Sequence, residues 1–177
     1  LDYLAANDGK PQESGKGSIS FLITGDEEDV AVNGTVKLLQ WAAARGEKFD
    51  HCIVGEPTLM QAVTAHKGKL GYRVTAHGLE AHSSLAPIGV NAIYMAADLI
   101  GEIRALQREI AEMGRRDGDY EVAYTTLHVG KMQGGEVMNI VPNRASFDFE
   151  IRYLPEDDGE AIAARIRNAA EKIAATY

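Results

Sequence analysis

The chain has 177 residues, of which 45% are hydrophobic and 25% charged, as in soluble globular proteins. Its formal net charge is −8 and it has no extended Lys/Arg cluster, which argues against nucleic acid as a partner. No apolar run approaches the ~20 residues of a membrane-spanning helix. The single cysteine, Cys52, excludes an intrachain disulfide and fits a reducing compartment, although bacterial secreted proteins can also lack cysteine. We expect it to be a small buried residue in a strand.

The first third of the sequence has the pattern of a βαβ unit. Residues 18–24 form an apolar run, as expected of a buried parallel strand. Val32, Val36, Leu39 and Ala43 then recur at helical spacing, which predicts a helix with Asn33 as its candidate N-cap and Gly46 just beyond its C-terminus. Residues 51–54 follow as the next strand. Strand, helix and strand at this spacing predict part of an α/β domain.

Both predicted strands lead directly into carboxylates. The first is followed by Glu27 and Glu28, and the second by Glu56. Open α/β sheets place their ligands at the carboxyl ends of strands, and clustered carboxylates need a cation or a proton to offset their repulsion. The pattern indicates a metal site with an adjacent general base. An acidic run after a strand is also typical of a solvated turn, and spacing alone does not separate the two interpretations.

The rest of the sequence predicts a second domain. Residues 70–76 alternate between apolar and polar, as in a half-buried antiparallel strand, and Pro87 marks the start of a helix. Two strands are expected at roughly 123–131 and 144–153, before a last helix whose acidic opening, Glu156-Asp157-Asp158, suits the positive end of its dipole. These are five of the six elements of a ferredoxin-like βαββαβ unit, with the last strand missing.

The ends of the sequence suggest an internal piece of a longer protein. The chain begins at Leu1 rather than at an initiator methionine, and it stops at Tyr177 with a helical pattern still running. We therefore expect a partial α/β domain over residues 1–68 and most of a second domain over residues 69–177.

Several short motifs follow one another in a specific order, although each is weak alone. They are Ile23-Thr24-Gly25-Asp26-Glu27-Glu28, Val54-Gly55-Glu56-Pro57-Thr58, Ala81-His82-Ser83-Ser84, Asn139-Ile140-Val141-Pro142 and the run from Phe147 to Pro155. The series resembles the di-zinc deacylases of the acetylornithine deacetylase and succinyl-diaminopimelate desuccinylase family, and it covers nearly the whole chain from Gly17 onward. The Ala-His-Ser-Ser motif followed by Pro-x-Gly-Val-Asn-Ala is closer to the acetylornithine deacetylases.

The resemblance implies an α/β fold in which residues 1–68 belong to a zinc-peptidase-like catalytic domain and residues 69–177 to a lid and dimerisation domain. It implies a cytoplasmic homodimer with two zinc ions per subunit, or cobalt in their place. The implied substrate is an N-acyl amino acid, with N-acetylornithine in arginine biosynthesis as the first candidate. A desuccinylase, an aminoacylase or a metal-dependent exopeptidase is the alternative on this scaffold. A module that only pairs subunits is the non-enzymatic alternative.

By resemblance, the three carboxylates have different roles at the metal site. Glu27 is the general base, Glu28 a ligand of one zinc ion and Glu56 a ligand of the other. A zinc-bound water has a pKa near 7, which makes an adjacent base effective. The family draws its remaining metal ligands from segments that this chain lacks. Since affinity depends on ligand number and geometry, we expect this polypeptide alone to be inactive.

The lid residues carry substrate roles by the same resemblance. His82 reaches across the dimer into the partner's active site and stabilises the tetrahedral oxyanion, a task worth about 3 kcal/mol for a preorganised donor. Asn139 and Arg152 hold the substrate, Arg152 through the planar fork that suits a carboxylate. For Arg152, simple solvation or pairing with Glu150 on the polar face of the strand is an equally open interpretation.

Overall fold

The computed structural model describes residues 19–25 and 33–177. The chain divides into two compact units, Leu1–Pro57 and Thr58–Tyr177, which are considered separately below. The dividing point lies before the boundary expected at residue 68, which remains a prediction for the complete protein. Within the described residues, none of the helices combines the length and apolar character needed to cross a bilayer.

The first unit contains the helix α2, Thr35–Ala44, where the sequence predicts one. Its C-terminus is followed by Gly46 at φ +72°, a left-handed conformation that glycine adopts without strain, as predicted. The predicted cap is wrong, because Gly34 occupies the N-cap position and Asn33 instead accepts a hydrogen bond from Lys37 Nζ at 2.8 Å.

The two strands predicted in this unit are not formed in the described residues. Residues 19–25 and 51–54 have no strand assignment, and their apolar side chains are exposed, Ile53 at 96%. The prediction of a buried Cys52 is also wrong, since this cysteine is exposed. The physical reason is that a parallel strand needs neighbours on both edges and cover on both faces. Within the described part of the chain, neither segment has a ladder partner.

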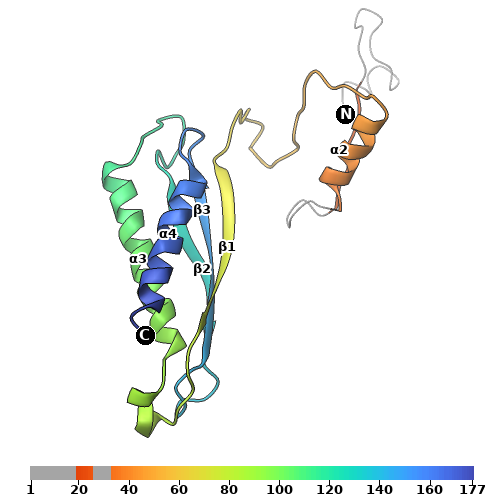
Figure 1. Cartoon of the computed structure of the whole chain (residues 1–177). Helices are drawn as coiled ribbons and strands as arrows, with labels where there is room; N and C mark the ends of the chain where they lie inside the picture. The colour runs from red at the N-terminus through yellow and green to blue at the C-terminus, as the bar shows by residue number, and fades with distance from the viewer. Residues whose placement is uncertain (1–18, 26–32) are drawn as a thin grey trace, which may run out of the picture. The chain divides into compact units, whose positions relative to one another are not determined.

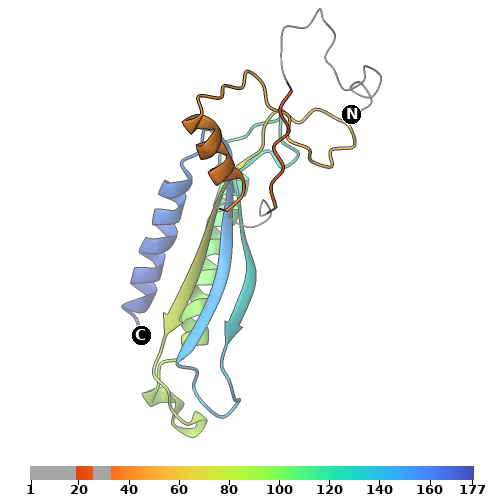
Figure 2. The same ribbon diagram turned by 90° about the vertical axis from the view of Figure 1, so that its right-hand side faces the viewer.

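The second unit is a three-stranded antiparallel sheet with two helices. In chain order it comprises β1 (Gly68–His77), α3 (Ala92–Met113), β2 (Thr126–Gly134), β3 (Arg144–Tyr153) and α4 (Gly159–Ala174). The strand order is β1-β3-β2, so the last strand lies in the centre. Both helices cover the same face of the sheet (Figures 1 and 2). This arrangement confirms the predicted run of ferredoxin-like elements.

The core lies between the helices and one face of β3. Phe147, Phe149 and Ile151 alternate with polar neighbours along the strand and are almost fully buried, as their spacing predicts. They pack against α3 and α4, whose buried residues include Ile103 and Ile166. The opposite face of the sheet carries the polar residues and is not covered by these helices.

The starts of the two helices differ in how well the sequence predicts them. Asp158 caps α4, since its Oδ1 accepts the Ala161 backbone N–H at 3.0 Å, close to the predicted acidic opening. The helix expected from Pro87 begins later, at Ala92. Pro87 lies within a separate 3₁₀ helix, Ser83–Ile88, and Asn91 caps α3 through its side-chain oxygen.

Candidate functional site

The predicted catalytic histidine lies at one end of the second unit, where two loops are joined by backbone hydrogen bonds. The loop before the 3₁₀ helix and the loop between β2 and β3 come together at this end in both views (Figures 1 and 2). Val141 N donates to Ala81 O at 2.7 Å, and Ser83 N donates to Asn139 O at 2.8 Å. These bonds bracket an antiparallel bridge between His82 and Ile140. The two loops therefore form a short ladder that fixes the backbone of His82.

A second contact secures the base of this ladder. Leu79 and Val90 exchange two backbone hydrogen bonds of 2.8 Å each. The neighbouring Gly78 lies so close that a Cβ added to it would stand 2.0 Å from the carbonyl oxygen of Val90. Only glycine permits this approach of two backbones. The loop that carries His82 is thus anchored on both sides.

The imidazole of His82 is oriented by Ser84. The backbone N–H of Ser84 donates to His82 Nδ1 at 3.2 Å, and the Ser84 hydroxyl lies 2.8 Å from the same nitrogen. A backbone N–H can only donate, so Nδ1 acts as the acceptor. The neutral ring then carries its proton on Nε2, leaving a donor at the outer edge of an exposed side chain. This is the form that a donor to an oxyanion requires.

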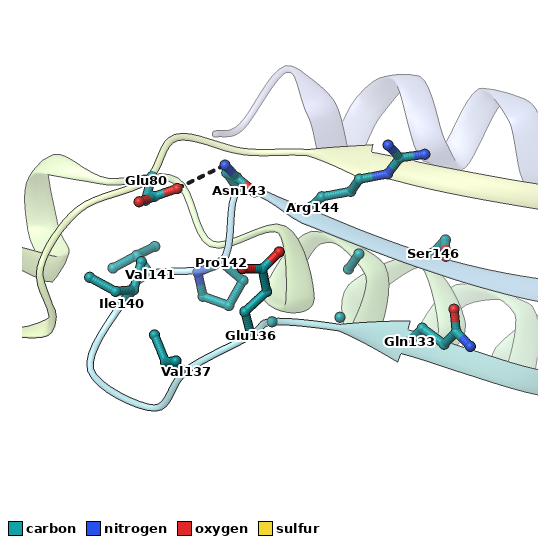
Figure 3. A pocket seen from close by; sticks show the side chains of 13 residues that line it. Glu80, Gln133, Glu136, Val137, Ile140, Val141, Pro142, Asn143, Arg144 and Ser146 are labelled. Carbon is teal, nitrogen blue, oxygen red and sulfur yellow. Dashed lines mark hydrogen bonds between the residues drawn. The ribbon is translucent and has the colours of Figure 1, made fainter.

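A cavity of about 290 Å³ adjoins the ladder on the β2–β3 side (Figure 3). Glu80 and Asn143 point toward one another in it, and Asn143 Nδ2 donates to Glu80 Oε2 at 2.9 Å. Ile140 and Val141 of the ladder also line the cavity. The Glu80–Asn143 bond ties the residue two positions before His82 to the start of β3, so it is a further restraint on the His82 loop.

The structure brings two of the predicted lid residues together and separates the third. Asn139 belongs to the same ladder as His82. Arg152 lies near the far end of β3, eight residues beyond Arg144, which is paired with the last residue of β1. At about 3.4 Å per residue this is about 27 Å along the strand. Arg152 Nε donates to Glu150 Oε1 at 3.2 Å, and its side chain remains 43% exposed.

The predicted metal site is only partly within the described residues. Glu27 and Glu28 lie outside them. Glu56 is described, is exposed and belongs to the first unit. Residues 19–25 and 33–177 contain no group of three or more His, Cys, Asp or Glu side chains suited to a metal ion. The described carboxylates thus do not by themselves form a metal site.

The residues that orient His82 are not among those predicted from the sequence. Ser84 could have been found, because the side chain at a helix N-cap, here His82, accepts the backbone N–H two residues further on. The Glu80–Asn143 bond joins positions 63 residues apart, and no local pattern signals it.

Comparison with known proteins places this geometry in a family. The model of the peptidase dimerisation domain of the M20 class matches residues 64–177. The chain belongs to this M20 dimerisation-domain family. The match starts just before β1 and includes the whole sheet, both helices and the His82 ladder.

Sequence relatives extend the similarity beyond the M20 dimerisation domain. The succinyl-diaminopimelate desuccinylase of Rhodopseudomonas palustris (strain HaA2) is 45% identical over 172 residues, covering 94% of this chain and 42% of the relative. The enzyme of the same name from Nitrobacter hamburgensis is 38% identical over 179 residues, covering 98% of this chain and 44% of the relative. The chain spans less than half the length of these relatives.

A solved structure shows the same fold. An amidohydrolase/peptidase from Burkholderia cenocepacia, described as putative, matches with a TM-score of 0.51 and 22% identity over 63% of this chain and 25% of its own. The match to the family model, together with the desuccinylase relatives, confirms the predicted family. The closer relation to acetylornithine deacetylases is not confirmed, because the relatives named above are desuccinylases.

Proposed function

We propose that the complete protein containing this chain is a metal-dependent amidohydrolase that cleaves the amide bond of an N-acyl amino acid. The observation that carries the proposal is the His82 ladder, which holds an imidazole with its Nε2–H directed outward. Membership of the M20 dimerisation-domain family and the 45% identical desuccinylase support it. Because the chain spans 42% of that relative, the remaining part of the site lies elsewhere in the complete protein.

His82 is proposed to donate a hydrogen bond to the oxygen that becomes negative as the amide carbonyl is attacked. A donor held in place before the reaction stabilises this charge without further reorganisation. Asn139 is proposed to contact the substrate from the same ladder. Glu27 as general base, Glu28 and Glu56 as metal ligands, and zinc as the metal remain proposals from the family resemblance.

The separation of His82 from Arg152 supports a homodimer with shared active sites. The two residues lie toward opposite ends of the unit. Their separation along the sheet is greater than the distance along β3 from Arg144 to Arg152. One small N-acyl amino acid cannot contact both within a single subunit. We propose that His82 serves the partner's site, while Arg152 binds a substrate carboxylate in the site of its own subunit.

The similarity to named desuccinylases makes N-succinyl-diaminopimelate the first candidate substrate. N-acetylornithine, and with it a place in arginine biosynthesis, is the second candidate. It is favoured by the run Ala81-His82-Ser83-Ser84 followed by Pro87-x-Gly89-Val90-Asn91-Ala92. Cytoplasmic localisation remains a prediction from the single cysteine.

The test is hydrolysis of both substrates by the complete protein with added zinc. Wild type is compared with Glu27→Gln and His82→Ala. We expect rapid hydrolysis by the wild type, a loss of several orders of magnitude in Glu27→Gln and a loss of about a hundredfold in His82→Ala. Equal, negligible rates for all three proteins on both substrates would contradict the proposed substrates.

The non-enzymatic alternative is tested by sedimentation. A dimer that forms with and without zinc, in a complete protein that hydrolyses no acylated amino acid, would favour a module that only pairs subunits. The 177-residue chain is expected to be inactive by itself. Zinc-dependent turnover by the chain that is abolished in Glu27→Gln would overturn that expectation.

A further inference from the structure

The face of the sheet opposite the helices is positively charged, although the whole chain carries a net charge of −8. Along β3 the side chains alternate between the face covered by the helices and the opposite face. Residues paired across an antiparallel ladder point to the same face, so the pairing with β3 shows which side chains of β1 and β2 point away from the helices. The outward carboxylates are Asp148 and Glu150. The outward cations are Lys69, Arg73, Lys131, Arg144 and Arg152. This surface, termed the open face, therefore attracts anions.

A hollow of about 530 Å³ lies in the open face. Two glycines leave space there, Gly71 on β1 and Gly130 on β2, on either side of the central strand. A Cβ added to Gly71 would meet no atom within 4 Å, and one added to Gly130 would meet only the ring of His128, at 3.5 Å or more. The hollow thus exists because side chains are absent, and its volume suits a small molecule.

The carboxylates at the hollow are already paired. Asp148 accepts two hydrogen bonds from Arg73, at 2.7 and 2.8 Å, and Glu150 accepts one from Arg152 at 3.2 Å. Lys69 lines the same hollow, and its ammonium group has no hydrogen bond or ion pair within the described residues.

The side chains of Lys131 and His128 also line the hollow and make no hydrogen bond to another described side chain. Lys131 stands directly opposite Asp148 in the strand register, which puts its side chain on the open face at the edge of the hollow. The hollow consequently presents ammonium groups from β1 and β2 that form no ion pair with any carboxylate in residues 19–25 and 33–177.

We propose that this hollow binds a small dicarboxylate, with Lys69 and Lys131 each contacting one carboxylate group and His128 between them. The ligand class follows from two separated ammonium donors on opposite sides of a space of small-molecule size. The identity of the natural ligand rests on the proposed function, under which it is the carboxylate-bearing part of an N-succinyl amino acid. Arg152, directly opposite Lys69 in the register, extends the same row of cations.

The test is NMR titration of the full 177-residue chain with succinate at constant ionic strength, following the ring resonances of His128. Acetate is titrated in parallel. We expect a saturable shift with succinate and binding of acetate weaker by about tenfold, because acetate can engage only one ammonium group. Equal affinities for the two anions would overturn the proposal, since they would indicate general charge attraction.

Two different variants address the same site. Lys69→Met combined with Lys131→Met removes charge, whereas Gly71→Val keeps every charge and adds atoms to the hollow at a position where a Cβ meets no atom within 4 Å. Both are expected to weaken succinate binding by at least about tenfold. Lys172→Met, on α4, is the matched control and is expected to bind as wild type does. Wild-type affinity in Gly71→Val would overturn the proposal even if the double variant did not fold.

The outcome separates this inference from the proposed function. Succinate binding without hydrolysis of any N-acyl amino acid by the complete protein would overturn the proposed function and leave the anion site standing. Hydrolysis without succinate binding would overturn the anion site alone.

Discussion

The imidazole Nδ1 of His82 accepts the backbone N–H of Ser84 at 3.2 Å and lies 2.8 Å from the Ser84 hydroxyl. The two residues are thus joined through both the backbone and the side chain of Ser84. Since the backbone N–H remains in any substitution, the ring keeps one anchor when the hydroxyl is lost. Ser84 therefore acts on the reaction through the orientation of His82.

We predict that Ser84→Ala lowers kcat of the complete protein by roughly three- to tenfold and leaves KM nearly unchanged. The expected loss corresponds to one hydrogen bond of about 1 kcal/mol that orients a group acting in the transition state. Steady-state kinetics on the preferred N-acyl amino acid measure it. Ser83→Ala is the matched control, because within the described residues the Ser83 side chain makes no hydrogen bond and should not affect kcat. Equal effects of the two substitutions would contradict a role for Ser84 in orienting His82.

Thr125 is a buried polar residue that joins the start of β2 to the chain after β3. Its side chain is fully buried, donates to Asp157 Oδ2 and accepts the backbone N–H of Leu154 at 3.0 Å. Thr125→Val keeps the shape but leaves that N–H without an acceptor, which is expected to cost about 1–3 kcal/mol of unfolding free energy. Urea denaturation measures the change. Thr126→Val, on the open face, should alter stability by less than about 0.5 kcal/mol.

Gly78 is predicted to be essential for the fixed position of the His82 loop. A methyl group in Gly78→Ala would collide with the Val90 carbonyl oxygen, and relief of such overpacking is expected to cost about 1–3 kcal/mol. Thermal denaturation measures the loss. Gly71→Ala is the control, because its added Cβ has no neighbour within 4 Å. Similar stability of the two variants would show that the loop adjusts freely.

The acid stability of the domain is predicted to depend on Arg73. Hydrogen bonding from Arg73 holds the pKa of Asp148 below its ordinary value of 3.8. A carboxyl whose pKa is lower in the folded state stabilises the protein above the unfolded pKa, and this contribution disappears as the pH falls through the folded pKa. Arg73→Met should therefore weaken the dependence of unfolding free energy on pH below about pH 4.

This prediction is checked by urea denaturation from neutral pH down to about pH 3. Arg108→Met, which removes an exposed arginine of α3 without an ion pair among the described residues, is the control and should keep the wild-type acid dependence. An unchanged acid profile in Arg73→Met would show that the pair contributes nothing to folding.

The elements predicted best are those whose own residues suffice to define them. The alternation of Phe147, Phe149 and Ile151 identifies β3 because the helices bury every second residue. The acidic opening of α4 likewise contains its cap, Asp158. In both cases the decisive interactions are local, or depend only on which face is apolar.

The failures arise where neighbours decide the outcome. Residues 19–24 and 51–54 are apolar, but among the described residues they find no adjacent strand, and an apolar run alone does not make a sheet. The family motifs identify His82 and Asn139, but not the ladder that joins them, which depends on backbone bonds between loops far apart in the sequence. The wide separation of Arg152 from His82 likewise emerges only from the strand register.

The strand order β1-β3-β2 has a consequence for how the domain is made. Among the described strands β1 pairs only with β3, from His77–Arg144 to Gly68–Tyr153, so its ladder is not complete until the end of β3 has been synthesised. The β2–β3 hairpin can form from neighbouring segments, whereas closing the sheet onto β1 must overcome the entropy of a long loop. On the ribosome, β1 and α3 are therefore synthesised before the central strand that completes the core they share. Folding of this domain is then timed by the appearance of β3, and substitutions in Phe147 or Phe149 should expose the nascent chain to aggregation more than equal losses of core in α4.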